Sequence, residues 1–206
     1  MRLIIATKNK SKMKEIRNIL SDIAFEIVSL DDLSEEFEID EDGKTFYENA
    51  KKKALTVSRV YRDDYVVGED SGLWVRYLQG APGIYSKRYS GKDSTDLKNN
   101  LKLLNQLKEV SSENRIAKFI CSLVLAKKGK EAARFQGQLK GLIHDKLEGA
   151  NGFGYDPLFF LPKFNKTTAQ LKPKQKNEIS HRFKAFIKLK EFLKNCNYQH
   201  NNFEEN

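Results

Sequence analysis

An alternating run of apolar side chains constrains the fold of this chain more than any other feature. From Ala117 to Leu125 every second residue is apolar, which is the pattern of a β-strand with one buried face. The turn-forming residues 127–130 follow, and residues 131–139 then read as an antiparallel partner strand. The sequence therefore predicts a β-hairpin in the second half of the chain.

Short strands and amphipathic helices are predicted on both sides of this hairpin. The strands are expected at 3–6, 25–28 and 65–68, and the helices at 11–20, 45–62, 94–108 and 178–194. Thr45 and Glu48 have the spacing of a capping box at the start of the second helix. Glu69 and Asp70 directly follow the strand 65–68, and α/β proteins usually build ligand sites at the ends of strands.

Length and composition bound the class of protein. The 206 residues are 39% hydrophobic and 32% charged, which fits one domain, or one domain with two lobes, and excludes a disordered chain. The longest purely apolar runs have four residues, whereas a bilayer span needs about 20. With two cysteines and no signal peptide, we expect a cytoplasmic protein whose thiols are free.

The formal net charge of +9 favours an anionic partner. Charge alone does not distinguish nucleic acid, an anionic membrane surface and a phosphorylated small molecule, and a lysine-rich solvated surface gives the same excess. We expect one two-lobed domain over residues 1–195 and a frayed polar tail over 196–206.

The first candidate site lies between the first strand and the first helix. Its residues combine a helix start with three lysines: Thr7, Lys8, Asn9, Lys10, Ser11 and Lys12. Backbone amides and the positive end of the helix dipole would bind phosphate there. Neither of the glycine-rich phosphate-binding patterns is present, so a solvated turn that caps the helix is the alternative.

Two carboxylates, Glu41 and Asp70, form a candidate magnesium site. Mg²⁺ takes oxygen ligands, generally one or two carboxylates, with water and substrate phosphates in its other positions. Glu41 belongs to the acidic run 31–42, in which no single residue stands out. The sequence by itself does not bring Glu41 near Asp70.

A glycine-rich loop at residues 151–157 is the third candidate. Gly152 and Gly154 flank Phe153, which would allow close backbone approach to a flat ligand and stacking on the ring. A tight turn around a core aromatic side chain is the alternative.

A basic cluster near the last helix is the fourth candidate. Lys176, His181 and Arg182 could reach a phosphate or a ring carbonyl, although a histidine next to an arginine also fits a structural role. The three histidines lie in unrelated contexts, so a histidine metal site is not expected.

The order and wording of these segments resemble one known family. IIATKNKSKMKEI is followed by EDGKTFYENAKKKA, GEDSGLWVRYLQGAPGIYSKRYSG, GANGFGYDPLFF and KNEISHR. These five motifs, in this order, resemble the inosine triphosphate pyrophosphatase family, also called dITP/XTP pyrophosphatases, over about residues 3–190.

The resemblance implies an α/β fold of two lobes around a long, curved, mixed β-sheet with flanking helices and a central substrate cleft, and usually a homodimer. It also implies the reaction, in which a non-standard purine triphosphate (ITP, dITP or XTP) and water give the monophosphate and pyrophosphate, with Mg²⁺ required. The implied role is to remove deaminated purines from the nucleotide pool.

The resemblance also implies a role for each candidate residue. The segment 7–12 and Ser71 would hold the triphosphate, while Glu41 and Asp70 would coordinate Mg²⁺. Asp70 would also activate water, and Lys53 would face the phosphates. The residues around the base would be Phe153, Gly154, Tyr155, Asp156, Lys176, His181 and Arg182.

Two positions depart from the family's usual pattern. Ser11 stands where glycine is frequent, and if that position required a positive φ, serine would add about 1 kcal/mol of strain. Glu69 stands where a second aspartate is common beside Asp70, which leaves any second metal position open.

Two other functions fit parts of the sequence. A Maf-like pyrophosphatase for modified pyrimidine nucleotides would share the α/β cleft and the metal-assisted reaction, but the FGYD and SHR segments favour the purine family. A basic nucleic-acid-binding module would bind in a salt-sensitive way, and no motif that reads DNA or RNA supports it. We therefore expect a small-molecule substrate and no nucleic-acid or membrane partner; the preference among ITP, dITP and XTP stays open.

Overall fold

A computed structural model describes the backbone of residues 1–201 and the side chains of residues 1–195. The chain divides into two compact units. Unit 1 consists of residues 1–70, residues 121–137 and the chain from Arg182 onward. Unit 2 consists of residues 71–120 and 138–181.

Within the described residues, seven strands form one mixed sheet in the order β2-β1-β3-β4-β5-β6-β7. The strands are β1 (Arg2–Ile5), β2 (Glu26–Ser29), β3 (Tyr65–Val75), β4 (Ile116–Lys127), β5 (Lys130–Ile143), β6 (Phe159–Leu161) and β7 (Lys166–Thr167). β1 pairs in parallel with β2 and β3, whereas β6 pairs antiparallel with β5 and β7. Mixed pairing with flanking helices confirms the predicted fold class.

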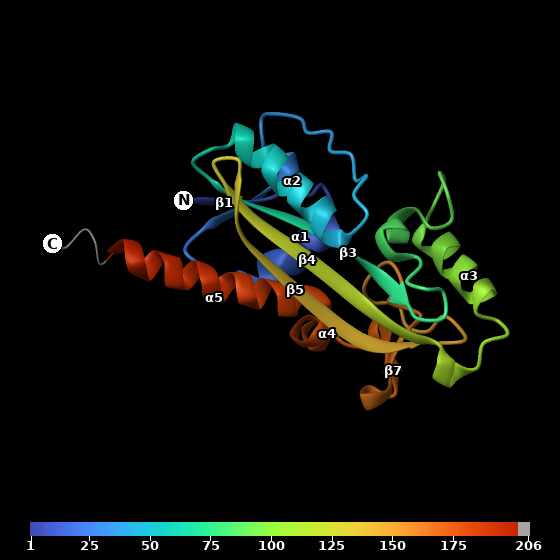
Figure 1. Cartoon of the computed structure of the whole chain (residues 1–206). Helices are drawn as coiled ribbons and strands as arrows, with labels where there is room; N and C mark the ends of the chain where they lie inside the picture. Colours follow the sequence, from blue (N-terminus) through green and yellow to red (C-terminus); the bar gives the residue numbers. More distant parts are fainter. Residues whose placement is uncertain (202–206) are drawn as a thin grey trace. The chain divides into compact units, whose positions relative to one another are not determined.

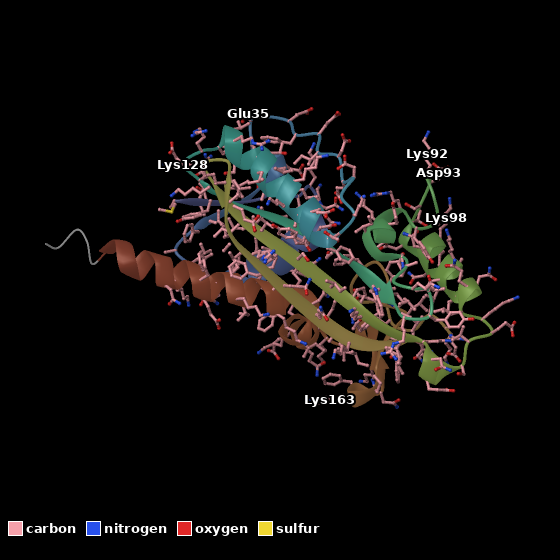
Figure 2. All side chains as sticks on the ribbon, in the orientation of Figure 1. Glu35, Lys92, Asp93, Lys98, Lys128 and Lys163 are labelled. Atoms are coloured by element: carbon pink, nitrogen blue, oxygen red, sulfur yellow. The ribbon has the colours of Figure 1, made fainter. Side chains whose placement is uncertain are left out.

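The predicted hairpin is formed by β4 and β5, which are neighbours in the sheet. Lys128 and Gly129 connect them with φ angles of 53° and 73°, the left-handed values of a two-residue hairpin turn. Lys128 marks this turn in Figure 2. The backbone N–H of Gly129 donates to Oγ of Ser58 at 3.0 Å, which ties the turn to a neighbouring helix.

In unit 1, helices cover both faces of the sheet (Figure 1). They are α1 (Lys10–Ile19), α2 (Phe46–Val60) and α5 (His181–Asn201). Leu3, Ile5 and Val67 pack with α1 and α5, whereas Ile4 and Val66 pack with α2. Side chains alternate along a strand, so neighbouring residues of β1 and of β3 face different helices.

Gly68 allows β3 to lie directly against α2. A Cβ atom at this position would be 1.9 Å from the carbonyl oxygen of Ala50 and 2.7 Å from the backbone nitrogen of Ala54. Only glycine fits so close an approach. The contact brings Asn49 and Lys53 of α2 beside Asp70 of β3.

Unit 2 has a core of its own. Its helices are α3 (Asp96–Gln106) and α4 (Pro173–Ile179), and its longest 3₁₀ segment is η2 (Gly83–Arg88). Leu73, Leu103, Phe119 and Phe159 belong to one buried cluster. The shorter 3₁₀ segments of the chain are η1 (Leu30–Asp32), η3 (Ser112–Asn114), η4 (Pro162–Phe164) and η5 (Thr168–Gln170).

The prediction that a strand ends at residue 68 was wrong. β3 continues to Val75, so Glu69 and Asp70 lie inside the strand and not beyond its end. Both carboxylates are buried, at 0% and 5% exposure. The strand tolerates them because neighbouring helices supply polar and cationic partners.

The C-terminal helices also differ from the prediction. Lys176 lies on the separate helix α4, which starts with Pro173 in its first turn, and α5 begins only at His181. α5 continues to Asn201, past its predicted end at residue 194, so part of the expected frayed tail is helical. Residues 202–206 of that tail lie outside the described residues. In the part of the chain that the structure describes, no helix is both long and apolar enough to cross a membrane.

Candidate active site

The first candidate segment forms the start of α1. Asn9 is the N-cap residue, and its side-chain oxygen accepts a hydrogen bond from the backbone N–H of Lys12 at 3.0 Å. The N–H of Asn9 in turn donates to Oγ1 of Thr7 at 3.2 Å. Ser11 lies inside α1 and does not have a positive φ, so the strain considered for serine at this position does not arise.

Three lysines accompany this helix start. The side chains of Lys8 and Lys10 are exposed, whereas Lys12 is partly buried. The first amides of a helix lack intrahelical acceptors, and the helix dipole adds positive potential at this end. The segment can therefore attract and bind an anionic group.

Lys53 connects the two candidate carboxylates. Its Nζ lies 2.9 Å from Oε1 of Glu41 and 3.8 Å from Oδ1 of Asp70, and it donates to the backbone oxygen of Glu69 at 3.2 Å. Asn49 donates from Nδ2 to Oδ2 of Asp70 at 3.1 Å. The structure thus brings Glu41 and Asp70 to one ammonium group, which the sequence did not predict.

Burial raises the pKa of Asp70 above its ordinary value. Lys53 and Lys12 oppose this effect, whereas the negative charge of Glu41 adds to it. A cation placed between the two carboxylates would relieve both the desolvation and the repulsion. In the described residues no group of three or more His, Cys, Asp or Glu side chains could hold a metal ion, so a metal here would rely on these two carboxylates and on its other ligands.

Arg182 is enclosed by two carboxylates of unit 1. Its Nη1 donates to Glu15 at 2.5 Å and its Nη2 donates to Glu69 at 3.0 Å, and only 2% of the side chain is exposed. Burial alone would lower the pKa of Arg182, but Glu69 and Glu15 more than offset it and hold the pKa above its ordinary value. Arg182 is therefore a fixed, charged group in the interior.

In unit 2, Asp156 organises the glycine-rich loop. Its Oδ2 accepts hydrogen bonds from Nζ of Lys176 at 2.7 Å and from the backbone N–H of Phe153 at 2.8 Å. Its Oδ1 accepts from Oγ1 of Thr168 at 2.8 Å. Nζ of Lys176 also lies 5.0 Å from the centre of the Phe153 ring. The loop, the lysine and the aromatic ring predicted to surround a base thus come together.

Tyr155 differs from its neighbours in this loop because it belongs to the core of unit 2. Only 4% of the residue is exposed, and its hydroxyl donates to the backbone oxygen of Ser86 at 2.9 Å. Burial raises the pKa of Tyr155 well above its ordinary value. The backbone of Gly154 is held by α3, through Oδ2 of Asp96 and Nδ2 of Asn100.

His181 is buried and stacks on Phe119, with ring centroids 4.9 Å apart and an interplanar angle of 18°. Ser71 follows Asp70 in β3 and is partly buried. Stacking therefore fixes the orientation of the His181 ring.

Several residues that hold this arrangement were not predicted from the sequence. Asn49 stands four positions before Lys53 and Glu15 three positions after Lys12, spacings that place each pair on one face of a helix. This spacing could have identified Asn49 and Glu15 from the sequence. No such spacing identifies Phe119 or Thr168, because their partners are distant in sequence.

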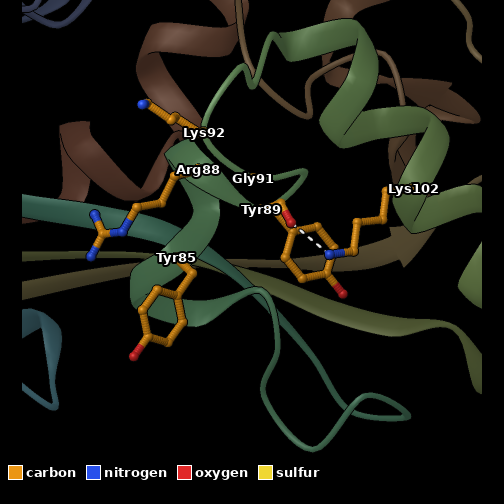
Figure 3. A pocket seen from close by; sticks show the side chains of 6 residues that line it. All are labelled: Tyr85, Arg88, Tyr89, Gly91, Lys92 and Lys102. Carbon is orange, nitrogen blue, oxygen red and sulfur yellow. Dashed lines mark hydrogen bonds between the residues drawn. The ribbon is translucent and has the colours of Figure 1, made fainter.

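A separate hollow of about 560 Å³ opens on unit 2 (Figure 3). It is lined by Tyr85, Arg88, Tyr89, Gly91, Lys92 and Lys102. Nζ of Lys102 donates to the backbone oxygen of Tyr89 at 2.7 Å and lies 4.5 Å from the centre of its ring. This hollow contains none of the predicted site residues.

Comparison with known proteins gives consistent matches over nearly the whole chain. The model of the Ham1 family matches residues 3–192. The dITP/XTP pyrophosphatase of Clostridium perfringens is 46% identical over 198 residues, which cover 94% of this chain and 97% of that protein. The dITP/XTP pyrophosphatase of Geobacter sulfurreducens is 45% identical, with 93% and 96% covered.

Solved structures of Ham1 proteins are also similar to this chain over nearly its whole length. The Ham1 protein of Staphylococcus aureus superimposes with a TM-score of 0.85 at 38% identity, covering 95% of this chain and 99% of that one. A HAM1 protein from Coxiella burnetii gives a TM-score of 0.87 at 34% identity, with the same coverage.

Proposed function

Because the chain belongs to the Ham1 family, we propose that it is a nucleoside triphosphate pyrophosphatase for non-standard purine nucleotides. The substrates are dITP, XTP and ITP, and the products are the monophosphate and pyrophosphate. The names of the relatives support this substrate class. The structural observation that carries the proposal is the pair of carboxylates, Glu41 and Asp70, that share the Lys53 ammonium group.

The start of α1 binds the triphosphate in this proposal. The first amides of α1 and the side chains of Lys8, Lys10 and Lys12 neutralise the phosphates, and Thr7, Asn9, Ser11 and Ser71 add polar contacts. Charge neutralisation matters most on the leaving pyrophosphate, where negative charge develops as the bond between the α and β phosphorus atoms breaks.

Glu41 and Asp70 are the proposed ligands of Mg²⁺. Two carboxylates fit an ion that keeps its other positions for water and substrate phosphates. When bound, the ion supplies Lewis-acid stabilisation of the phosphate charge. Asn49 donates to Oδ2 of Asp70 and so orients this carboxylate. A carboxylate bound directly to Mg²⁺ is a poor base, so Asp70 either holds the ion or accepts a proton through a metal-bound water.

The loop of Asp156 binds the base. Phe153 offers a stacking surface, and Lys176 and Asp156 fix the loop beside it. Donors from Lys176, His181 or the loop amides of unit 2 meet the 6-oxo oxygen of hypoxanthine or xanthine. The 6-amino group of adenine would leave those donors unpaired, so ATP is rejected.

We also expect a homodimer and a cytoplasmic location, and both stay predictions. On unit 2 the side chains of Tyr77, Tyr85, Leu97 and Leu101 are exposed and available for contact with a second copy. Sedimentation equilibrium would measure the oligomeric state, and a monomer at micromolar concentration would contradict the homodimer.

Pyrophosphate release from ITP, dITP, XTP, GTP, ATP and dUTP, with and without Mg²⁺, tests the proposed function. Strong Mg²⁺-dependent release from the first three, lost in Asp70→Asn, is the expected result. Equal activity on ATP would contradict the proposed base recognition, and preferential activity on dUTP would point to a pyrimidine nucleotide enzyme.

A further inference from the structure

Glu69 is the centre of a group of four charged side chains in unit 1, which we call the Glu69 cluster: Lys12, Glu15, Glu69 and Arg182. Glu69 and Arg182 are buried, and Lys12 and Glu15 are partly buried. Oε2 of Glu69 lies 2.8 Å from Nζ of Lys12, and Oε1 accepts from Nη2 of Arg182 at 3.0 Å. The Glu69 side chain has no exposed surface. Two carboxylates and two cations balance in charge, which is what makes such burial tolerable.

Glu69 and Asp70 face different sides of the sheet. Val67 packs with α1 and α5, and Glu69, two residues later, contacts Lys12 of α1 and Arg182 of α5. Val66 packs on the side of α2, and Asp70, four residues later, contacts Asn49 and Lys53 of α2. This alternation is the period of a β-strand, so the Glu69 carboxylate is directed away from the candidate metal ligands.

We propose that Glu69 is a positioning residue for the cations of the active site and not a second metal ligand. The inference rests on the proposed function. Lys12 is the member of the Glu69 cluster that can meet the substrate, because 15% of its side chain is exposed compared with 2% for Arg182. The Glu69 carboxylate holds the Lys12 ammonium at the start of α1 and, at the same time, anchors the start of α5.

The backbone of Glu69 has a related role. Its carbonyl oxygen accepts the hydrogen bond from Lys53, the residue that joins Glu41 and Asp70. Glu69 therefore contacts cations on α1, α2 and α5 through different atoms. Changing only its side-chain charge should affect the α1 and α5 cations and leave the backbone contact to Lys53 in place.

The variant Glu69→Gln keeps the size of the side chain and removes its charge. With dITP as substrate, we expect KM to rise about tenfold or more, while the half-saturating Mg²⁺ concentration stays within about twofold of wild type. Asp70→Asn, measured in parallel, should change turnover and Mg²⁺ dependence. Glu131→Gln is the matched control, because Glu131 pairs with Lys51 at 3.0 Å in the same unit but contacts none of the site residues named above.

Two further variants separate positioning from folding. Glu69→Asp keeps the charge, so KM should return to within about threefold of wild type and Mg²⁺ dependence should be unchanged; this variant carries the test if Glu69→Gln does not fold. In a Lys12→Met background, Glu69→Gln should raise KM by less than a further factor of about three, because the Lys12 ammonium group that Glu69 positions is already absent.

A rise in the half-saturating Mg²⁺ concentration of about tenfold in Glu69→Gln or Glu69→Asp would overturn the inference, because a metal ligand behaves in that way. A wild-type KM in Glu69→Gln would also overturn it. If the wild type itself released no pyrophosphate from dITP or XTP, the proposed function would be contradicted as well, so the two failures are distinguishable.

Discussion

Nζ of Lys53 lies 2.9 Å from Oε1 of Glu41, and this ion pair fixes the acidic segment 31–42 to helix α2. The same ammonium group lies 3.8 Å from Oδ1 of Asp70. Lys53 thus holds one carboxylate of this acidic run, that of Glu41, near the strand that carries Asp70. The candidate metal site depends on this ion pair.

Replacing Glu41 by glutamine should weaken metal binding specifically. The half-saturating Mg²⁺ concentration for pyrophosphate release should rise about tenfold or more, because one charged oxygen ligand is lost. Glu38→Gln is the matched control, since Glu38 lies in the same segment but is exposed. Equal shifts in the two variants would mean that the segment acts through its total charge.

Asp70 should make stability depend on pH in the metal-free protein. Burial raises its folded pKa above the ordinary value of 3.8, so its contribution to stability is fully present below that value and is lost as the pH rises through the folded pKa. In EDTA, the unfolding free energy of wild type minus that of Asp70→Asn should fall as the pH rises above about 4. Denaturant titrations measure it, and a difference that grows with pH would contradict the burial argument.

Two glycines of the base-binding loop offer a matched pair of alanine substitutions. Both have positive φ, 83° at Gly152 and 63° at Gly154. A Cβ atom at Gly152 would lie 2.1 Å from Oδ2 of Asp156, whereas a Cβ at Gly154 would meet no atom of the described residues within 4 Å. Each alanine adds about 1 kcal/mol of backbone strain, and only Gly152→Ala should displace Asp156.

We therefore expect the KM for dITP to be about tenfold higher in Gly152→Ala than in Gly154→Ala. Steady-state kinetics of both variants would measure this. The same KM in the two variants would show that the Asp156 contact does not matter for base binding.

Removing the hydroxyl group of Tyr155 should destabilise unit 2. Tyr155→Phe loses the hydrogen bond to the backbone oxygen of Ser86 and should cost about 1 kcal/mol in the free energy of unfolding. Tyr85→Phe is the control, because Tyr85 is 56% exposed. A loss in Tyr155→Phe no larger than in Tyr85→Phe would contradict the core role of this hydroxyl.

Local patterns predicted the elements whose signals lie within a few residues. The hairpin of β4 and β5 follows from alternation and its turn, and the start of α2 follows from Thr45 and Glu48. The extent of β3 could not be predicted in this way. A run such as Glu69-Asp70 indicates a strand end unless buried partners exist, and one of those partners, Arg182, is 113 residues away.

In the candidate site, too, some residues could be predicted from the sequence and some contacts could not. Asp70, Lys12 and the glycine-rich loop could be selected from the sequence, because their residue types suit phosphate, metal and base. The proximity of Glu41 to Asp70 could not be predicted, since it depends on how the acidic segment, which has no helix or strand after η1, folds around Lys53. The different directions of Glu69 and Asp70 became visible only once β3 was seen to continue through them.

The ratio of kcat/KM for dITP to that for dATP, measured with Mg²⁺, tests the central claim most directly. The base of dITP has a 6-oxo group and a proton on N1, whereas the base of dATP has a 6-amino group and no proton on N1. The sugar and the triphosphate are the same in both nucleotides. We expect a ratio of about 100 or more in favour of dITP, with monophosphate and pyrophosphate as products. A ratio near one, or release of single phosphate groups, would contradict the account.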